Sequence, residues 1–111
     1  MYEYAATLVR VVDGDTIDVN LDLGFRVHFE TRIRLARINA PERYAEGKGG
    51  KEATAWLTEA LPTAVNELML RTAKPLQDKY GRYLAEVFVR REGNLVDVNA
   101  EMVAAGHAVW Y

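Results

Sequence analysis

The sequence predicts a small β-barrel that carries two helices, which by content is an α+β fold. Two observations support this. Hydrophobic and polar residues alternate from Thr16 to Leu23 and again from Arg26 to Leu35, which is typical of strands with one buried face. After these strands, apolar residues recur at helical spacing, at Ala53, Trp56, Leu57, Ala60 and Leu61.

The other strands follow from local composition. Asp13-Gly14-Asp15 and Gly24 are typical turn residues between the first three strands. Val65 to Thr72 and Tyr83 to Val89 are rich in β-forming residues. We therefore expect five strands, at residues 4–12, 16–23, 26–35, 65–72 and 83–89.

The helix boundaries are also predicted by single residues. Pro62 cannot continue the first helix, and either Asp97 or Asn99 caps a short C-terminal helix that ends by Gly106. Five short strands, with a helix between the third and the fourth, is the element order of a five-stranded Greek-key barrel of the oligonucleotide/oligosaccharide-binding (OB) type. We expect residues 1–111 to form a single domain of this kind.

Composition excludes several classes of site. The chain has 111 residues and no cysteine, so it has no disulfide, no thiolate metal site and no cysteine nucleophile. There is no apolar run long enough for a transmembrane helix, and residues 1–12 lack the pattern of a secretory signal. We expect no membrane partner, and a secreted protein if a signal was trimmed or an intracellular one otherwise.

Charge is unevenly distributed along the chain, although the net charge is only −2. Residues 26–51 and 71–91 each carry a net charge of +4, and the three blocks around them carry −4, −3 and −3. The two basic blocks either converge in the fold to form one positive groove for phosphate or are the solvated faces of amphipathic strands.

Two residues near the end of the third strand suggest phosphodiester hydrolysis. The guanidinium of Arg34 matches two phosphate oxygens, and the carboxylate of Glu42, just after Pro41, suits proton transfer from water. Taken singly, Arg34 also fits a strand arginine that extends into solvent, and Glu42 fits an exposed loop residue.

Two further segments carry candidate residues. Asp13 and Asp15 flank a glycine and could bind a hard cation, although turn chemistry alone also explains them. Arg82 stands at a loop-to-strand junction, where a rigid sheet can direct it into a cleft. Lys79 offers a phosphate contact and Tyr80 a stacking surface, and the alternative is a charged surface loop.

Four separated motifs, in this order, resemble the staphylococcal nuclease (thermonuclease) family. They are Val12-Asp13-Gly14-Asp15-Thr16, Ile33-Arg34-Leu35, Ala40-Pro41-Glu42 and Asp78-Lys79-Tyr80-Gly81-Arg82-Tyr83-Leu84-Ala85. The similarity runs from Ala6 to about Gly106. It implies a five-stranded OB barrel and a calcium-dependent nuclease, a phosphodiesterase acting on single-stranded DNA or RNA or on unpaired regions of a duplex.

The resemblance also implies roles in phosphate chemistry. By position, Arg34 and Arg82 match the two arginines that bind the phosphate, and Glu42 matches the carboxylate that activates the attacking water. Lys79 and Tyr80 match residues that contact the terminal phosphate of a bound nucleotide. Two guanidiniums suit this task because in-line attack on phosphorus develops negative charge on the equatorial oxygens.

The implied calcium site departs from the family at one position. Asp15 matches a direct ligand, Ala40 a ligand through its backbone carbonyl, and Asp13 a nearby carboxylate outside the direct ligands. Asn39 stands where the family has a second aspartate. An amide still offers an oxygen but brings no charge, so we expect Ca²⁺ to bind weakly.

Other departures concern the substrate surface. The chain stops at Tyr111, before the tyrosine-bearing segment and long C-terminal helix of the family, so Trp110 and Tyr111 are expected to replace part of the base stacking. We expect a monomer or a homodimer. Residues 43–51 form a short, glycine-rich loop in which the family's contacts cannot be assigned.

Two functions therefore compete. Retention of Arg34, Glu42 and Arg82 favours a metal-dependent nuclease, because a degenerate relative is expected to lose these residues first. The Asn39 change favours the alternative, a catalytically weak or inactive OB-fold module that binds nucleic acid or protein.

Overall fold

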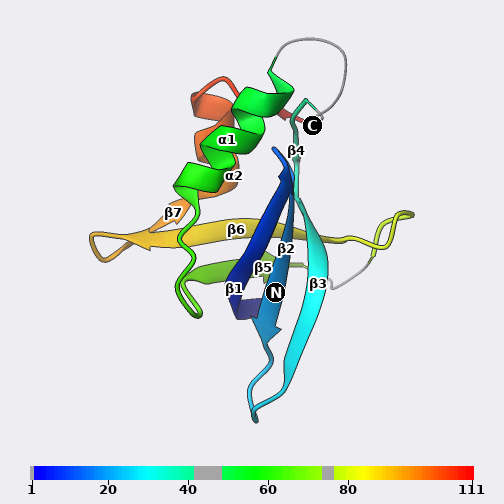
Figure 1. The fold of residues 1–111 in the computed structure, drawn as a ribbon, viewed down its shortest axis with the longest axis vertical. Coiled ribbons are helices and arrows are strands. Elements are labelled where there is room, and N and C mark those ends of the chain that lie inside the picture. Colours follow the sequence, from blue (N-terminus) through cyan, green and yellow to red (C-terminus); the bar gives the residue numbers. More distant parts are fainter. Residues whose placement is uncertain (1, 42–48, 74–76) are drawn as a thin grey trace.

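The computed structural model describes residues 2–41, 49–73 and 77–111. Glu42 and most of the expected loop at residues 43–51 lie outside the described residues. The elements, in chain order, are β1 (Tyr2–Asp13), β2 (Thr16–Asp22), β3 (His28–Leu35), β4 (Ile38–Asn39), α1 (Gly50–Ala60), β5 (Leu68–Thr72), β6 (Tyr83–Arg91), β7 (Asn94–Asp97), α2 (Val98–Ala104) and β8 (Val109–Trp110) (Figure 1).

Five of these strands close into a barrel, which confirms the predicted fold. They are hydrogen-bonded in the order β3-β2-β1-β5-β6, and β3 also pairs with β6. The closing pair is parallel and joins residues 33–35 to residues 83–85, whereas the other neighbours in the barrel are antiparallel. Strand β7 pairs with the far part of β6, outside the closed barrel.

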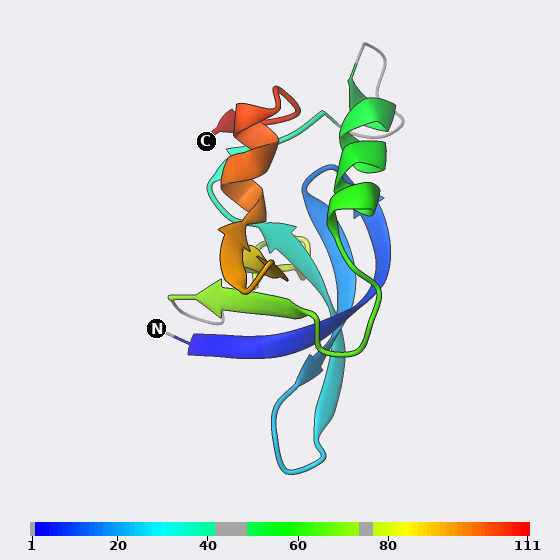
Figure 2. The same ribbon diagram turned by 90° about the vertical axis from the view of Figure 1, so that its left-hand side faces the viewer.

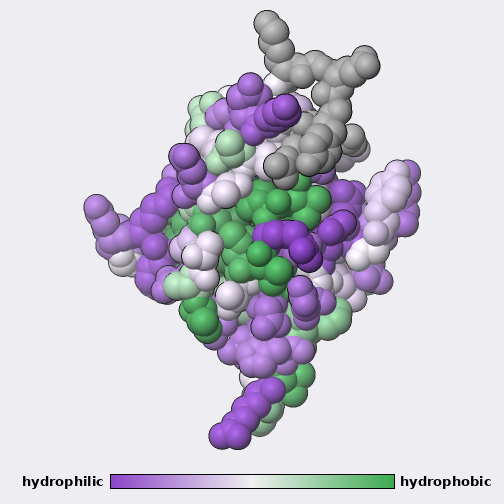
Figure 3. All heavy atoms as spheres, in the orientation of Figure 1, coloured by the Kyte–Doolittle hydropathy of each residue, from purple (hydrophilic) through white to green (hydrophobic). Residues whose placement is uncertain are grey.

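The alternating residues of the strands fill the barrel, and the helices cover one end of it. Figures 1 and 2 show α1 and α2 at this end, while the β2–β3 hairpin extends from the other. Hydrophobic side chains gather in the middle of the face seen in Figure 3, with hydrophilic side chains around them. Fully or almost fully buried residues from the barrel strands and from the helices form one core. It includes Ala6, Ile17, Val19, Leu35, Leu57, Leu68, Leu70, Val87, Val89, Val98 and Met102.

Two predicted strands begin later than the alternation indicated. Strand β3 starts at His28 because Phe25 and Arg26 adopt positive φ angles of 54° and 63°, in a turn closed by a bond from Val27 N to Gly24 O. Strand β5 starts at Leu68 because Asn66 has a φ of 56° in the preceding turn. The alternation of hydropathy gives no information on the sign of φ. The sequence therefore indicated a turn at Gly24 but not the positive φ angles that follow it or the one at Asn66.

Three short strands were not predicted. Strands β4 and β8 pair with each other and have two residues each, too few to show a period. Strand β7 was missed, and β6 continues beyond the predicted strand to Arg91 and pairs with it. Glu92 and Gly93, with φ angles of 52° and 82°, form the hairpin turn.

Both helices begin and end close to the predicted positions. Helix α1 starts at Gly50, within the expected loop, and Leu61 leaves it with extended backbone just before Pro62. Asp97, one of the two predicted caps, accepts the N–H of Ala100 and so begins α2. Among the described residues, no helix is long and apolar enough to cross a membrane.

Asn99, the other predicted cap, instead connects α2 to the barrel. Its side chain is buried, with the residue 2% exposed. Its Oδ1 accepts the N–H of Val87 on β6 at 3.1 Å, and its Nδ2 donates to the carbonyl of Ala36 at 2.8 Å. The amide therefore satisfies two backbone groups, one on β6 and the other just after β3.

We expect Asn99→Ala to reduce the free energy of unfolding by about 2 to 4 kcal/mol, because it leaves both backbone groups without their partner. Urea denaturation measures the change. Asn94→Ala, at an exposed residue of β7, is the control and should change stability by less than about 0.5 kcal/mol. Equal effects of the two substitutions would contradict this role of Asn99.

Candidate functional site

The turn between β1 and β2 places a buried carboxylate at the end of the barrel that carries the helices. Asp15 is 8% exposed. Its Oδ1 accepts the hydroxyl of Thr16 at 3.1 Å, and its Oδ2 accepts the N–H of Ala40 at 2.9 Å. Its backbone carbonyl accepts the N–H of Leu35 at 2.8 Å. These bonds join the turn to the end of β3 and to the residue that follows β4.

Gly14 lets the turn approach helix α1 closely. A Cβ atom at Gly14 would lie 2.8 Å from the Cβ of Ala53 and 3.0 Å from the Cβ of Ala40. The first distance is too short for real side-chain atoms and the second is unusually tight, so the glycine is needed for space. These three small residues allow the Asp15 turn to pack closely against helix α1.

Arg34 lies beside Asp15. Its side chain is only 13% exposed, and its Nη1 donates to the carbonyl of Leu35 at 2.7 Å. Its Nη2 lies 3.4 Å from Oδ2 of Asp15 and 3.4 Å from Oδ1 of Asn39. The structure thus brings four of the predicted site residues together, namely Asp15, Arg34, Asn39 and Ala40.

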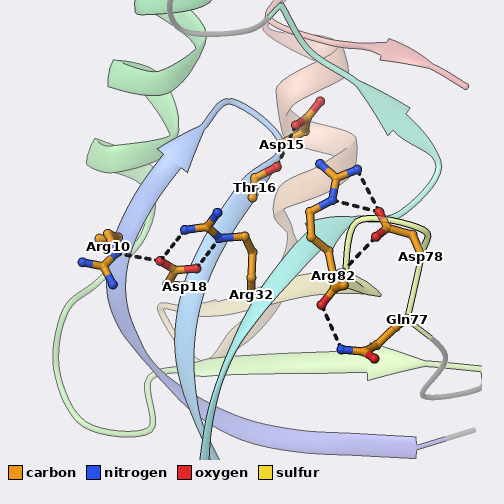
Figure 4. Close-up of polar contacts among 9 residues, drawn as sticks. Arg10, Asp15, Thr16, Asp18, Arg32, Gln77, Asp78 and Arg82 are labelled. Atoms are coloured by element: carbon orange, nitrogen blue, oxygen red, sulfur yellow. Dashed lines mark hydrogen bonds and ion pairs between the residues drawn. The ribbon is translucent and has the colours of Figure 1, made fainter.

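Arg82 is held by a carboxylate to which the sequence analysis gave no role. Asp78 Oδ2 accepts both Nε and Nη2 of Arg82 at 2.8 Å, and its Oδ1 accepts the N–H groups of Tyr80 and Arg82 at 2.9 Å (Figure 4). Gly81 has a φ of 79° in this turn, and its carbonyl accepts Nε2 of Gln77. Asp78 therefore orients both the backbone of the loop and the guanidinium.

The same contacts determine the protonation of Asp78. Its partial burial alone would raise the pKa of the carboxyl group. The N–H of Arg82, the Arg82 guanidinium and the N–H of Tyr80 outweigh this effect and hold the pKa below its usual value. The ion pair is therefore present at neutral pH. In the sequence, an aspartate stands four residues before an arginine, with a glycine between them. This spacing is the signal that would have indicated that Asp78 orients Arg82.

One groove of about 530 Å³ joins the two arginines. Residues from β3 and β4, from the loop before β6 and from the C-terminus line it, so the two basic blocks of the sequence meet here. The predicted residues on its wall are Arg34, Asn39, Lys79, Tyr80 and Arg82, and Arg37 and Tyr111 join them.

Aromatic rings extend the groove toward solvent. The ring of Tyr80, which is 70% exposed, lies 5.1 Å from Nζ of Lys79 and 5.2 Å from Cζ of Arg82. Arg37 lies over the ring of Trp110, and the N–H of Tyr111 donates to the Arg37 carbonyl at 2.9 Å. Cations and π faces therefore alternate along this wall, an arrangement that suits both phosphates and bases.

The donors around Asp15 fit a hard cation in type but not in charge. The Asp15 carboxylate, the Asn39 amide oxygen and the Ala40 carbonyl are oxygen donors of the kind that Ca²⁺ prefers. In the described ranges, however, no group of three or more His, Asp or Glu side chains is placed to hold a metal ion. Asp13 begins the same turn, and Glu42 lies outside the described residues.

Comparison with known proteins agrees with this geometry. The family model described as staphylococcal nuclease homologue matches residues 32–111. An uncharacterized protein of Methanocaldococcus jannaschii is 31% identical over 97% of this chain and 59% of its own length. Endonuclease YhcR of Bacillus subtilis is 32% identical over 98% of this chain and 9% of its own length.

A protein of Shigella flexneri named micrococcal nuclease is 34% identical over 98% of this chain and 59% of its own length. The chain thus spans less than two thirds of each of these relatives. The family match covers most of the chain and includes the end of β3, the loop before β6 and helix α2. The chain belongs to the staphylococcal nuclease homologue family.

Proposed function

We propose that this domain is a nuclease that hydrolyses phosphodiester bonds of single-stranded or unpaired DNA, RNA or both. The observation that carries the proposal is the convergence of Arg34 and Arg82, from distant parts of the chain, on one groove. Guanidiniums suit a phosphate, since each presents a planar fork of donors. The nuclease names of two relatives support the same reaction class.

In this mechanism the arginines act mainly on the transition state. Arg34 is fixed by the Leu35 carbonyl and Arg82 by Asp78, so neither guanidinium must reorient when charge develops on the phosphate oxygens. Glu42 takes the proton of the attacking water, as the family resemblance implies. Lys79 and Tyr80 bind an adjoining phosphate at the edge of the groove.

A cation near Asp15 completes the proposed site. Asp15, Asn39 and the Ala40 carbonyl would hold it, and Asp13 would add charge nearby. When bound, Ca²⁺ supplies positive charge that stabilises the phosphate oxygens. With one carboxylate replaced by an amide, we propose weak binding that requires a high calcium concentration.

The second candidate function is an OB-fold module that binds nucleic acid or protein and has little or no activity. Asn39 favours it, because this residue reduces the charge available to a cation. The wall of Tyr80, Lys79 and Arg82 would bind single strands in either case.

Cleavage of single-stranded DNA tests the main proposal. With Ca²⁺ present, Arg34→Gln and Arg82→Gln should each lower kcat/KM by about 100- to 1000-fold, as for loss of other preorganised donors. Arg90→Gln, at an exposed arginine on β6 outside the groove, is the matched control and should not change the rate.

Two further measurements decide between the candidate functions. Activity that is equal with Ca²⁺, with a chelator and in Glu42→Ala would contradict the proposed mechanism. Binding of single-stranded DNA without cleavage, across a series of divalent metals, would establish the binding module instead.

The proposed cation site has its own test. Asn39→Asp should tighten Ca²⁺ binding by at least about tenfold, because it restores a charged ligand. Isothermal titration calorimetry measures the dissociation constant without any need for activity. Asn94→Asp, at an exposed residue of β7, controls for added charge. Tight binding by the unmodified chain that does not change in Asn39→Asp would refute the weak-site proposal.

The role of Asp78 predicts a pH dependence of stability. Because its folded pKa is lowered, the ionised form contributes stability above the usual carboxyl pKa, and this contribution disappears as pH falls through the lowered pKa. Asp78→Asn should therefore cost about 1 to 2 kcal/mol near neutral pH and progressively less in acid. Urea denaturation as a function of pH, with the exposed Glu59→Gln as control, measures it. A cost that stays constant into the acid range would contradict this assignment.

A further inference from the structure

A second group of charged side chains lies on the outer wall of the barrel beside the groove. Asp18 on β2 is opposite Arg32 on β3 and Arg10 on β1 in the strand registers. Arg32 and Arg34 lie two residues apart on the same face of β3, so their Cα atoms are about 6.5 to 7 Å apart. Arg32 is therefore the next basic side chain along the strand from the proposed phosphate site.

The closing pair of the barrel brings Arg32 near Arg82 as well. Strands β3 and β6 are parallel, with Arg34 opposite Leu84. Continued toward the N-terminus by two residues, this register places Arg82 level with Arg32. Figure 4 shows Arg32 between Asp18 on one side and Arg82 on the other. A row of arginines thus crosses the barrel wall from Arg82 through Arg32 to Arg10.

Asp18 holds two guanidiniums side by side. Its Oδ1 accepts Nε of Arg32 at 2.8 Å, and its Oδ2 accepts Nη2 of Arg32 at 3.1 Å and Nε of Arg10 at 2.6 Å. Hydrogen bonding to Arg32, opposed by burial and helped by Arg10, lowers the pKa of Asp18. The carboxylate is therefore ionised, and the three residues carry a net charge of +1.

The arginines keep donors that face solvent. Their side chains are 62% exposed for Arg10 and 49% exposed for Arg32, whereas the Asp18 side chain is 8% exposed. Nη1 of Arg32 and both terminal nitrogens of Arg10 take no part in the bonds to Asp18. The Asp18 acceptor is thus covered, and both arginine side chains remain about half exposed or more. The Asp13 carboxylate also attracts Arg32.

Stability alone does not account for two arginines on this aspartate. One bidentate arginine already satisfies the carboxylate, and an added exposed ion pair is worth about 0 to 1 kcal/mol. Two ordered guanidiniums with outward donors, however, match the oxygens of a phosphate diester. Arg32 lies two residues from Arg34 along β3, a distance of the scale of one nucleotide step in an extended chain, and Arg10 lies farther away, on β1 beyond β2.

We propose that Arg32 and Arg10 form a second phosphate subsite, which binds the backbone phosphate next to the one held by Arg34 and Arg82. The ligand class is an extended single-stranded polynucleotide, whose backbone runs from the groove across β3 and β2 toward β1. Asp18 is a positioning residue, since it orders the two guanidiniums and does not contact the strand. This inference rests on the proposed function and deepens it.

The test compares ligands of different length. Fluorescence anisotropy with chelator present, so that no cleavage occurs, gives the dissociation constants of a labelled dinucleotide and of a labelled oligothymidylate long enough to span the wall. Arg32→Gln and Arg10→Gln are tested singly, so that Asp18 always keeps one arginine. Arg90→Gln is the matched control for loss of an exposed arginine.

Each of the two variants should weaken binding of the oligonucleotide several-fold and leave the dinucleotide unchanged. The slope of log K against log salt should become less steep by about 0.7 for each phosphate contact that is lost. Arg32→Lys should restore part of the affinity, because it returns the charge without the fork. Thermal denaturation checks that each variant is folded.

Three outcomes would overturn this assignment. Unchanged oligonucleotide binding and salt slope in both variants would remove the subsite and leave the proposed function intact. An equal loss for both ligands would show that the substitutions act on the main groove or on the fold. Failure of the unmodified chain to bind any oligonucleotide with chelator, together with failure of Glu42→Ala to bind one with Ca²⁺, would refute the proposed function and the subsite with it.

Discussion

Three residue pairs hold β3 against β6, and the site depends on them. The pairing is parallel, which needs a long connection, and the chain between the two strands supplies β4, α1 and β5. It converts an open sheet into a closed barrel and pairs the end of β3 with the start of β6. It also brings Arg34 next to the strand that Arg82 precedes, although the two residues are far apart in the sequence. The pairing that closes the barrel around its core therefore also assembles the groove.

Four arginines, Arg10, Arg32, Arg34 and Arg82, each lie against an aspartate in the structure. Asp15 lies beside Arg34, Asp18 holds Arg32 and Arg10, and Asp78 holds Arg82. The carboxylates offset part of the positive charge of these arginines. They also restrict the guanidiniums to one orientation before any phosphate arrives. Less conformational entropy then remains to be lost on binding.

Sequence patterns predicted the fold well where a physical period exists. The alternation of β2 and the apolar face of α1 reflect burial against one core, and both are found as predicted. The turn at Gly24 was predicted, but the positive φ angles of Phe25 and Asn66 could not be, because they follow from local closure of the chain. Strands β4 and β8 were missed because two residues have no period. Asn99 was assigned to a cap, whereas tertiary contacts make it a buried link between α2 and β6.

The site was only partly predictable. The motifs drew attention to Asp15, Arg34 and Arg82, and the structure places all three around or beside one groove. The orienting role of Asp78 and the pairing of Arg32 with Asp18 depend on registers and side-chain directions that no short pattern contains. Whether Glu42 reaches the same groove remains a prediction, because it lies outside the described residues.

The contact between Gly14 and Ala53 has a consequence for how binding can be observed. Ala53 belongs to the first turn of α1, and its N–H donates to the Gly49 carbonyl. Because the Asp15 turn packs directly on this helix, a ligand that steadies the turn must also steady the helix start. Protection of the Ala53 amide against hydrogen exchange would then report that a ligand is bound at Asp15, although this amide does not contact the ligand.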